Sequence, residues 1–211
     1  RQVLIDTHGK VEARPPTAVE EERVQMANGR ERSVYTLSTE HKAFIASSDM
    51  LLEAQFQNEE YVASLEEARP ALAYIPGQIL YNHGHLEAAR ERLHKVIERW
   101  PGKDESAFAA SLIVDSWQEE GDLAKVRMWA GKFSRMSLGA SEAAVAKNLN
   151  FTNLEEGARF KMAAQHVEDG ERELAAEAFL AFMTDFPQSQ RIKKAHYNAA
   201  NNFEILGQVE R

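Results

Sequence analysis

The sequence contains no cysteine, which excludes disulfides, thiolate catalysis and cysteine-based zinc sites. Stretches that alternate apolar and polar residues over a strand's length are scarce, and only residues 2–6 resemble a strand. No apolar run is long enough to cross a bilayer, and no signal peptide is visible. We therefore expect an all-α protein in which this chain makes no direct membrane insertion.

Basic residues are also in the minority, with 25 Lys and Arg against 33 Asp and Glu, a net charge of −8. Such a surface repels phosphate backbones and anionic lipids, so nucleic acid is not an expected partner. The hydrophobic fraction of 44% and the charged fraction of 27% are typical of a globular chain that buries a core. Neither nucleic acid nor an anionic membrane surface is therefore expected as a direct ligand.

The N-terminal third carries irregular helix signals. Residues 1–16 are predicted to form an extended arm, followed by N-terminal helices over residues 17–70. Thr17 and Glu20 form a capping-box pattern that opens a helix, and Gly29 can close it.

Two further helices are predicted before the pattern becomes regular. Apolar residues at spacings of three and four indicate a helix over residues 38–56. Asn58 can cap a short helix carrying Tyr61 and Leu65, and Pro70 is expected to end it.

From residue 71 the predicted helices come in pairs, each with a glycine between its two members. These glycines are Gly84, Gly121, Gly170 and Gly207, at intervals of 37, 49 and 37 residues. Glycine favours the left-handed conformation that ends a helix. The longer interval contains twelve extra residues, most simply residues 137–148, and these are expected to add a short helix after Ser141.

The second helix of each pair repeats a pattern of small and large residues. Gly84, Leu86, Ala89, Leu93, Val96 and Pro101 match the second-helix pattern of the tetratricopeptide repeat (TPR) family, and Gly170, Ala175, Phe179, Phe182 and Pro187 match it nearly as well. The chain thus resembles that family over residues 71–211, with units at about 71–101, 104–137, 153–187 and 189–211. The Gly121 unit lacks the final proline. In the Gly84 unit, Pro76 is expected to kink or shorten the first helix.

This resemblance implies a right-handed α-solenoid, a superhelix of antiparallel helix pairs whose first helices line a concave partner-binding face. The implied face comprises Tyr74, Gln78, Tyr81, Asn82, Ser111, Asp115, Gln118, Phe160, Lys161, Tyr197, Asn198 and Asn201. The Lys and Asn pair with which the family clamps acidic C-terminal peptides is missing from every unit. The resemblance therefore implies that another protein or a peptide segment, of a kind other than an acidic C-terminal peptide, binds to this face.

Three closely spaced histidines, His83, His85 and His94, raise the question of a metal site. A chain reversal at Gly84 would separate the first two, and the nine residues from His85 to His94 place those two on opposite faces of a helix. We interpret them as solvent-facing turn residues and expect no metal and no cofactor.

His166 is expected at a packing seam rather than in catalysis. No known catalytic motif is present, so we expect no enzyme activity.

These features together predict a non-catalytic scaffold in a multiprotein assembly. The extended period is similar to that of TPR-like proteins of the bacterial envelope, of the outer-membrane assembly lipoprotein and Tol-Pal accessory types. That likeness implies a periplasmic or outer-membrane-associated location, with a cytoplasmic one as the alternative. Other hypotheses are a helical module of a larger enzyme, a peptide-sensing regulator and a metal-dependent enzyme. The last unit has only its first helix, so we expect more protein beyond Arg211.

Overall fold

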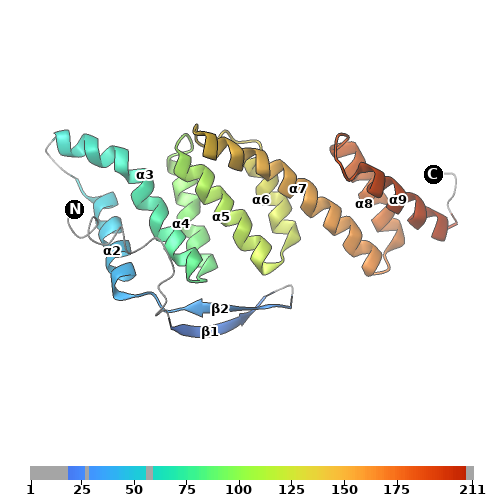
Figure 1. The fold of residues 1–211 in the computed structure, drawn as a ribbon, viewed down its shortest axis with the longest axis horizontal. Helices are drawn as coiled ribbons and strands as arrows, with labels where there is room; N and C mark the ends of the chain where they lie inside the picture. Colours follow the sequence, from blue (N-terminus) through green and yellow to red (C-terminus); the bar gives the residue numbers. More distant parts are fainter. Residues whose placement is uncertain (1–18, 27–28, 56–58, 208–211) are drawn as a thin grey trace.

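The computed structural model describes residues 19–26, 29–55 and 59–207, and within them the chain is mostly helical. An N-terminal β-hairpin precedes eight described helices that pack in sequential pairs (Figure 1). The elements are β1 (Glu20–Gln25), β2 (Glu31–Tyr35), α2 (Thr39–Glu53), α3 (Glu59–Asn82), α4 (Leu86–Arg99), α5 (Asp104–Glu120), α6 (Leu123–Phe133), α7 (Glu142–Glu168), α8 (Arg172–Asp185) and α9 (Ile192–Ile205).

The helix predicted from Thr17 to Gly29 is wrong over its described part, so the protein is not purely α-helical. Strands β1 and β2 pair antiparallel, and the register is irregular between Glu20 and Glu22. Gly29 has a φ of 74°, as expected for a helix end, but it lies in the hairpin connection instead. The predicted arm over residues 1–16, with its possible strand, lies outside the described residues.

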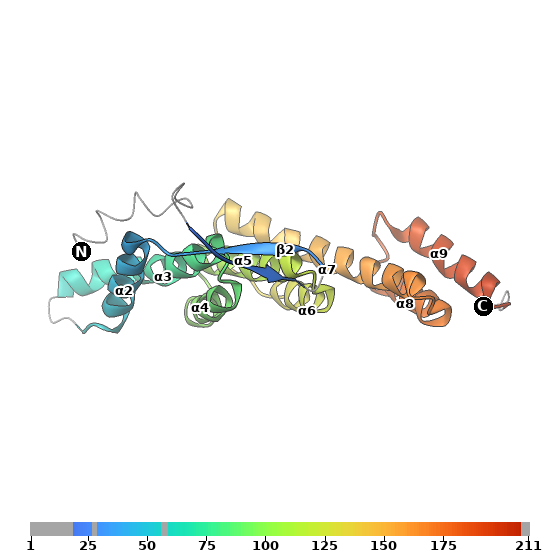
Figure 2. The same cartoon turned by 90° about the horizontal axis from the view of Figure 1, so that it is seen from below.

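The hairpin docks onto the turn between α3 and α4. The Tyr35 amide donates to the carbonyl of His83 at 2.9 Å, and His85 Nε2 donates to the carbonyl of Tyr35 at 2.9 Å. Arg32 donates to the carbonyl of Gly84. A hairpin alone is only marginally stable, so these contacts hold it along the ends of helices α4 to α6 (Figures 1 and 2).

Helix α3 runs through both of its prolines. The prediction that Pro70 ends a helix is therefore wrong, and Pro76 does not shorten one. A proline removes one backbone hydrogen bond and crowds the preceding turn, and the axis of α3 bends in Figure 1 rather than ending. Both prolines are buried, so packing offsets the lost hydrogen bonds.

The predicted glycine turns are confirmed. Gly84, Gly121, Gly170 and Gly207 have φ values of 85°, 76°, 79° and 71°. Each follows a helix, and at the first three a second helix begins within two residues. After Gly121 the side chain of Asp122 accepts from the Lys125 amide at 2.9 Å, so it caps α6 as an acidic residue at that position should.

The extra residues between the second and third units lengthen a helix instead of forming a separate one. Helix α7 begins after Ser141, as predicted, and Ser141 Oγ accepts from the Ala144 amide at 3.2 Å. It then continues without a break for 27 residues to Glu168. The extra residues therefore extend the helix that ends before Gly170.

Two main apolar clusters hold the helices together. The larger cluster joins α3 to α7 as far as Ala158, and the smaller one joins α7 from Phe160 onward to α8 and α9. The predicted packing residues Ala89, Leu93, Ala175 and Phe179 are all fully buried. A Cβ on Gly77 would lie 2.8 Å from Leu93 Cδ2, so α3 and α4 meet closely there.

Candidate functional site

The first helices α3, α5 and α7 pack against one another in sequence order. Across α3 and α5, a set of interacting side chains forms a surface that we call the first-helix face. It comprises Tyr74, Tyr81, Phe108, Ser111, Asp115 and Glu119. The sequence predicted four of these residues, and the contacts of the predicted ones add Phe108 and Glu119.

The aromatic part of this face begins at Tyr74. Its ring centroid lies 6.3 Å from that of Phe108 on the next first helix. Burial, with a smaller contribution from the charge of Glu105, raises the pKa of the Tyr74 hydroxyl to about 12. The phenol therefore stays neutral and presents an aromatic surface with one polar group.

Tyr81 links the same two helices by a polar contact. Its hydroxyl donates to Glu119 Oε1 at 2.7 Å. Burial and this hydrogen bond raise the pKa of Tyr81 far above its ordinary value, while the nearby guanidinium of Arg32 opposes the rise. Because Arg32 belongs to β2, the hairpin contributes positive charge to this end of the face.

Asp115 is half-buried on α5. It lies in the sequence between Phe108, which contacts Tyr74, and Glu119, which accepts from Tyr81. Burial raises the pKa of its carboxyl, whereas the charge of Lys147 on α7 and a 3.5 Å contact from Ser111 Oγ act in the opposite direction. A 3.5 Å hydrogen bond is weak. The face therefore contains a carboxylate whose charge is poorly compensated within the chain.

The other predicted residues on α3 and α5 differ in their accessibility. Gln78 and Asn82 are half-buried, and Gln118 is exposed. Ser111 is only 7% exposed, so little of it is available to a partner. Of the predicted residues on these two helices, Tyr74 and Tyr81 contact the facing helix, through Phe108 and Glu119.

The predicted residues of α7 and α9 differ widely in how far they are buried. Phe160 packs into the smaller core, with its ring centroid 5.3 Å from that of Phe179 and 5.4 Å from that of Phe182. Lys161 is exposed, and Tyr197 is 70% exposed. Helix α9 packs on α8 at the opposite end of the molecule from α3 (Figure 1).

The remaining predicted residues on α9 are Asn198 and Asn201, which are both half-buried. The neighbouring Asn202, which sequence reasoning missed, is buried; it accepts from Arg172 at 3.1 Å and donates to the Asn198 carbonyl at 2.7 Å. The structure therefore does not bring the predicted α9 residues together with those of α3 and α5.

The prediction that His83 faces solvent is wrong. Its side chain is 1% exposed, and its ring lies 4.6 Å from that of His41, centroid to centroid. His85 instead holds the hairpin, and His94 packs with its ring centroid 4.4 Å from that of Trp129. The half-buried His166 contacts Glu171 across its turn, 2.6 Å from Nδ1 to Oε2. No group of three or more potential metal ligands occurs among the residues that the structure describes.

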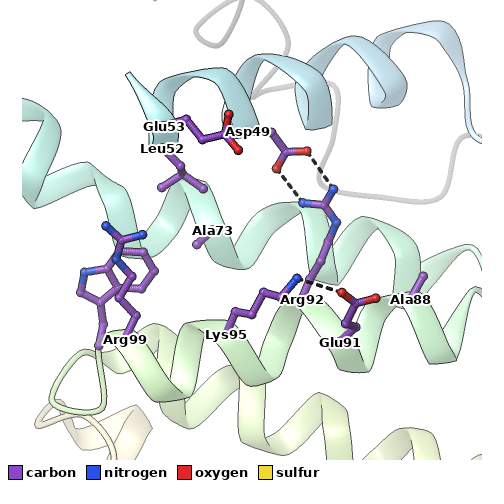
Figure 3. Close-up of a pocket in the computed structure, with 10 residues that line it drawn as sticks. Asp49, Leu52, Glu53, Ala73, Ala88, Glu91, Arg92, Lys95 and Arg99 are labelled. Atoms are coloured by element: carbon purple, nitrogen blue, oxygen red, sulfur yellow. Dashed lines mark hydrogen bonds and ion pairs between the residues drawn. The ribbon is translucent and has the colours of Figure 1, made fainter. Parts of the chain in front are cut away.

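A second surface, which the sequence did not predict, lies between α2 and α4 over α3. We call it the α2–α4 groove; its volume is about 460 Å³ (Figure 3). It is lined by Asp49, Leu52, Glu53, Ala73, Ala88, Glu91, Arg92, Lys95, Arg99 and Trp100. The available sequence signal was the helical spacing of Arg92, Lys95 and Arg99, but the facing wall comes from a helix about forty residues earlier in the chain.

Among the described residues, none of the helices combines the length and the apolar character that crossing a bilayer requires. When the chain is compared with known proteins, it matches no protein family, no curated protein and no solved structure.

Proposed function

We propose that this protein is a non-catalytic protein-binding scaffold, built as a right-handed TPR-like superhelix, that holds a partner segment on its first-helix face. Sequential packing of helix pairs around left-handed glycines supports the repeat architecture. Placement in a cell-envelope assembly, in the periplasm or at the outer membrane, belongs to the same proposal and rests on the resemblance of the repeat pattern.

The observation that carries this proposal is the coupling of aromatic and polar groups between α3 and α5. Tyr74 lies near Phe108, and Tyr81 donates to Glu119, so two neighbouring first helices present rigid rings beside hydrogen-bonding groups. Tyrosine is enriched among the residues that dominate binding energy, because it combines apolar area with a polar group at a low entropic cost.

Partner capture with matched variants tests the proposal. The immobilised wild-type chain is cross-linked in a lysate of its source cells, the captured protein is identified by mass spectrometry, and its affinity is then measured with purified material. We expect the double variant Tyr81→Ala, Asn82→Ala to weaken binding at least tenfold. The control Met128→Ala changes an exposed side chain on the second helix α6 and should bind like the wild type.

A second double variant, Tyr197→Ala with Asn201→Ala, tests whether the partner extends to α9. Loss of affinity in both double variants would indicate a segment that spans the molecule, and loss only with the α3 variant would confine it to α3 and α5. Undiminished affinity in a quadruple variant that still melts at the wild-type temperature would contradict the proposal.

A further inference from the structure

The α2–α4 groove has two walls of opposite charge. Helix α4 places Arg92, Lys95 and Arg99 along one wall, and helix α2 places Asp49 and Glu53 along the other. In Figure 3 the two helices lie on either side of the groove, and the side chain of Arg92 reaches across it to Asp49. Glu91 on α4 also lines the groove and is, among the described lining residues, the one acidic residue on the basic wall, so the charges are largely but not completely sorted by wall.

Some of these charges are already engaged within the chain. Arg92 Nη1 and Nη2 donate to the two carboxylate oxygens of Asp49 at 2.7 and 2.8 Å, and this pair ties the walls together. The bond from Arg92 is the main reason that the pKa of Asp49 is lowered. Lys95 donates to Glu91 at 2.8 Å on the exposed surface of α4, and such exposed pairs exchange partners at little cost.

One charge on each wall remains available. The guanidinium of Arg99 lies 4.9 Å from the ring centroid of Trp100, but no salt bridge to a carboxylate is found for it in the described part of the chain. Glu53 on the facing wall likewise has no ion pair with a described residue. Leu52 and Ala73 supply apolar surface to the same groove (Figure 3). Trp100 also lines it.

The spacing of the charges matches an extended peptide. Lys95 and Arg99 are four residues apart on a helix, as are Asp49 and Glu53, so each pair is separated by about 6 Å along its axis. In an extended strand, every second side chain points to the same side at intervals of about 6.6 Å. A strand whose acidic side chains face α4 and whose basic side chains face α2 therefore meets Arg99 and Glu53 directly. At the next side chain on each side it meets Lys95 and Asp49, where it exchanges with Glu91 and Arg92.

We propose that the α2–α4 groove is a second docking site, which binds an extended segment of a partner protein with alternating acidic and basic residues. A segment of one charge sign would meet a repelling wall whichever way it lay. The methylene stems of long charged side chains would cover Leu52 and the Trp100 ring. This site shares no side chain with the first-helix face and does not depend on the function proposed for that face.

Two synthetic peptides of identical composition test the proposal. Acetyl-Glu-Lys-Glu-Lys-amide has the alternating pattern, and acetyl-Glu-Glu-Lys-Lys-amide has the same charges in blocks. Each is titrated at low ionic strength into the ¹⁵N-labelled full chain, and the amide resonances are followed together with the Trp100 indole N–H. We expect saturable shifts at the residues of the groove and at least threefold tighter binding of the alternating peptide.

Matched variants locate the contacts. Glu53→Gln and Arg99→Gln should each weaken binding of the alternating peptide by about two- to fivefold, as expected for loss of one exposed ion pair. Glu173→Gln, an exposed carboxylate on α8, should bind like the wild type. Tyr81→Ala should also leave this binding unchanged, which separates a failure here from a failure of the first-helix face.

Three results would overturn the proposal. The first is equal affinity for the two peptides, because alternation would then have no role. The second is a set of shifts outside the groove or no shifts at all. The third is the same response to inorganic phosphate alone, which would reduce the groove to a simple anion site at Arg99.

Discussion

The imidazoles of His41 and His83 meet edge to face in the protein interior, with their ring centroids 4.6 Å apart. His41 belongs to α2, and His83 follows the last residue of α3, where its Nδ1 donates to the Ile79 carbonyl at 2.9 Å. Burial, and then the neighbouring His83, lower the pKa of His41, while Glu40 acts weakly in the opposite direction. Helix α2 is thus held against α3 partly by a pair of rings that pack best when neutral.

We expect acidification to destabilise this contact. The pKa of His41 is lower in the folded chain than its ordinary value of 6.5, so below pH 6.5 the unfolded state binds more protons than the folded state. The stability present above pH 6.5 is therefore lost as pH falls towards the folded pKa. His41→Gln cannot take up the proton, and its melting temperature should fall by roughly 2–4 °C less than that of the wild type between pH 7.5 and 5.

The exposed His196 supplies the control for this experiment. His196→Gln should keep the wild-type pH dependence, because its ring is not buried. An identical slope of melting temperature against pH for His41→Gln and wild type would show that the buried pair is not the source of the effect.

Alanine substitutions at Gly84 and Gly170 separate the free-energy cost of a steric clash from that of backbone strain. Both have positive φ, but a Cβ on Gly84 would lie 2.6 Å from the carbonyl oxygen of Ser33, whereas a Cβ on Gly170 meets nothing within 4 Å. We expect Gly170→Ala to cost about 1–2 kcal/mol from backbone conformation alone. Gly84→Ala should cost about 1–3 kcal/mol more, because the hairpin must shift.

Urea unfolding curves measure both free energies, and limited trypsin digestion at Arg30 and Arg32 reports whether the hairpin is released. Faster cleavage is expected only in Gly84→Ala. Equal destabilisation by the two substitutions would mean that the hairpin shifts away from the added Cβ without any loss in the free energy of unfolding.

The partly buried charge of Asp115 is expected to lower the stability of the folded protein at neutral pH. Burial raises the pKa of its carboxyl, so at neutral pH the folded chain carries a charge that the unfolded chain holds more easily. Asp115→Asn should therefore stabilise the protein at pH 7 by up to about 1 kcal/mol, and the gain should disappear below the unfolded value of 3.8. Thermal melts at pH 7 and pH 3.5 measure the difference.

The exposed carboxylate of Asp169 is the control, and Asp169→Asn should change stability by no more than about 0.5 kcal/mol at either pH. A destabilised Asp115→Asn protein at pH 7 would show that attraction to Lys147 outweighs burial.

Phe160 and Tyr197 were both predicted to face a partner, but the structure predicts different consequences for their loss. Phe160 packs against Phe179 and Phe182 in the smaller core, so Phe160→Ala should cost about 2–4 kcal/mol. Tyr197 is 70% exposed, and Tyr197→Ala should change the free energy of unfolding by less than about 0.5 kcal/mol. Chemical denaturation measures both values, and a large loss of stability at Tyr197 would contradict the assignment.

The signals for the helix pairs were readable from the sequence because they are local. A glycine ends a helix through its own backbone freedom, and Ala89 or Leu93 is buried wherever two helices of a pair approach each other. These signals predicted the turns at Gly84 and Gly170 and the packing within each pair. Tyr81 was placed on the partner-binding face by the resemblance, and its hydroxyl donates to Glu119 on α5.

The hairpin and the α2–α4 groove depend on contacts between distant residues, and this is why they were missed. The Gly29 signal suits a helix end and a hairpin connection equally well, and only docking of Tyr35 onto His83 distinguishes them. Arg92 likewise meets Asp49 across 43 residues of sequence. His83 was misassigned for the same reason, because its partner ring comes from α2.

Helix α7 carries residues of both apolar clusters on one unbroken axis, with Ala158 in the larger and Phe160 in the smaller. Each residue added to a helix rotates everything beyond it by about 100° and moves it about 1.5 Å. The number of residues in α7 between the two clusters therefore sets the direction, around the α7 axis, in which α8 and α9 project from the rest of the molecule. A single inserted residue between the clusters would swing that end through more than a quarter turn, whereas seven would return it to within about 20° of its original direction.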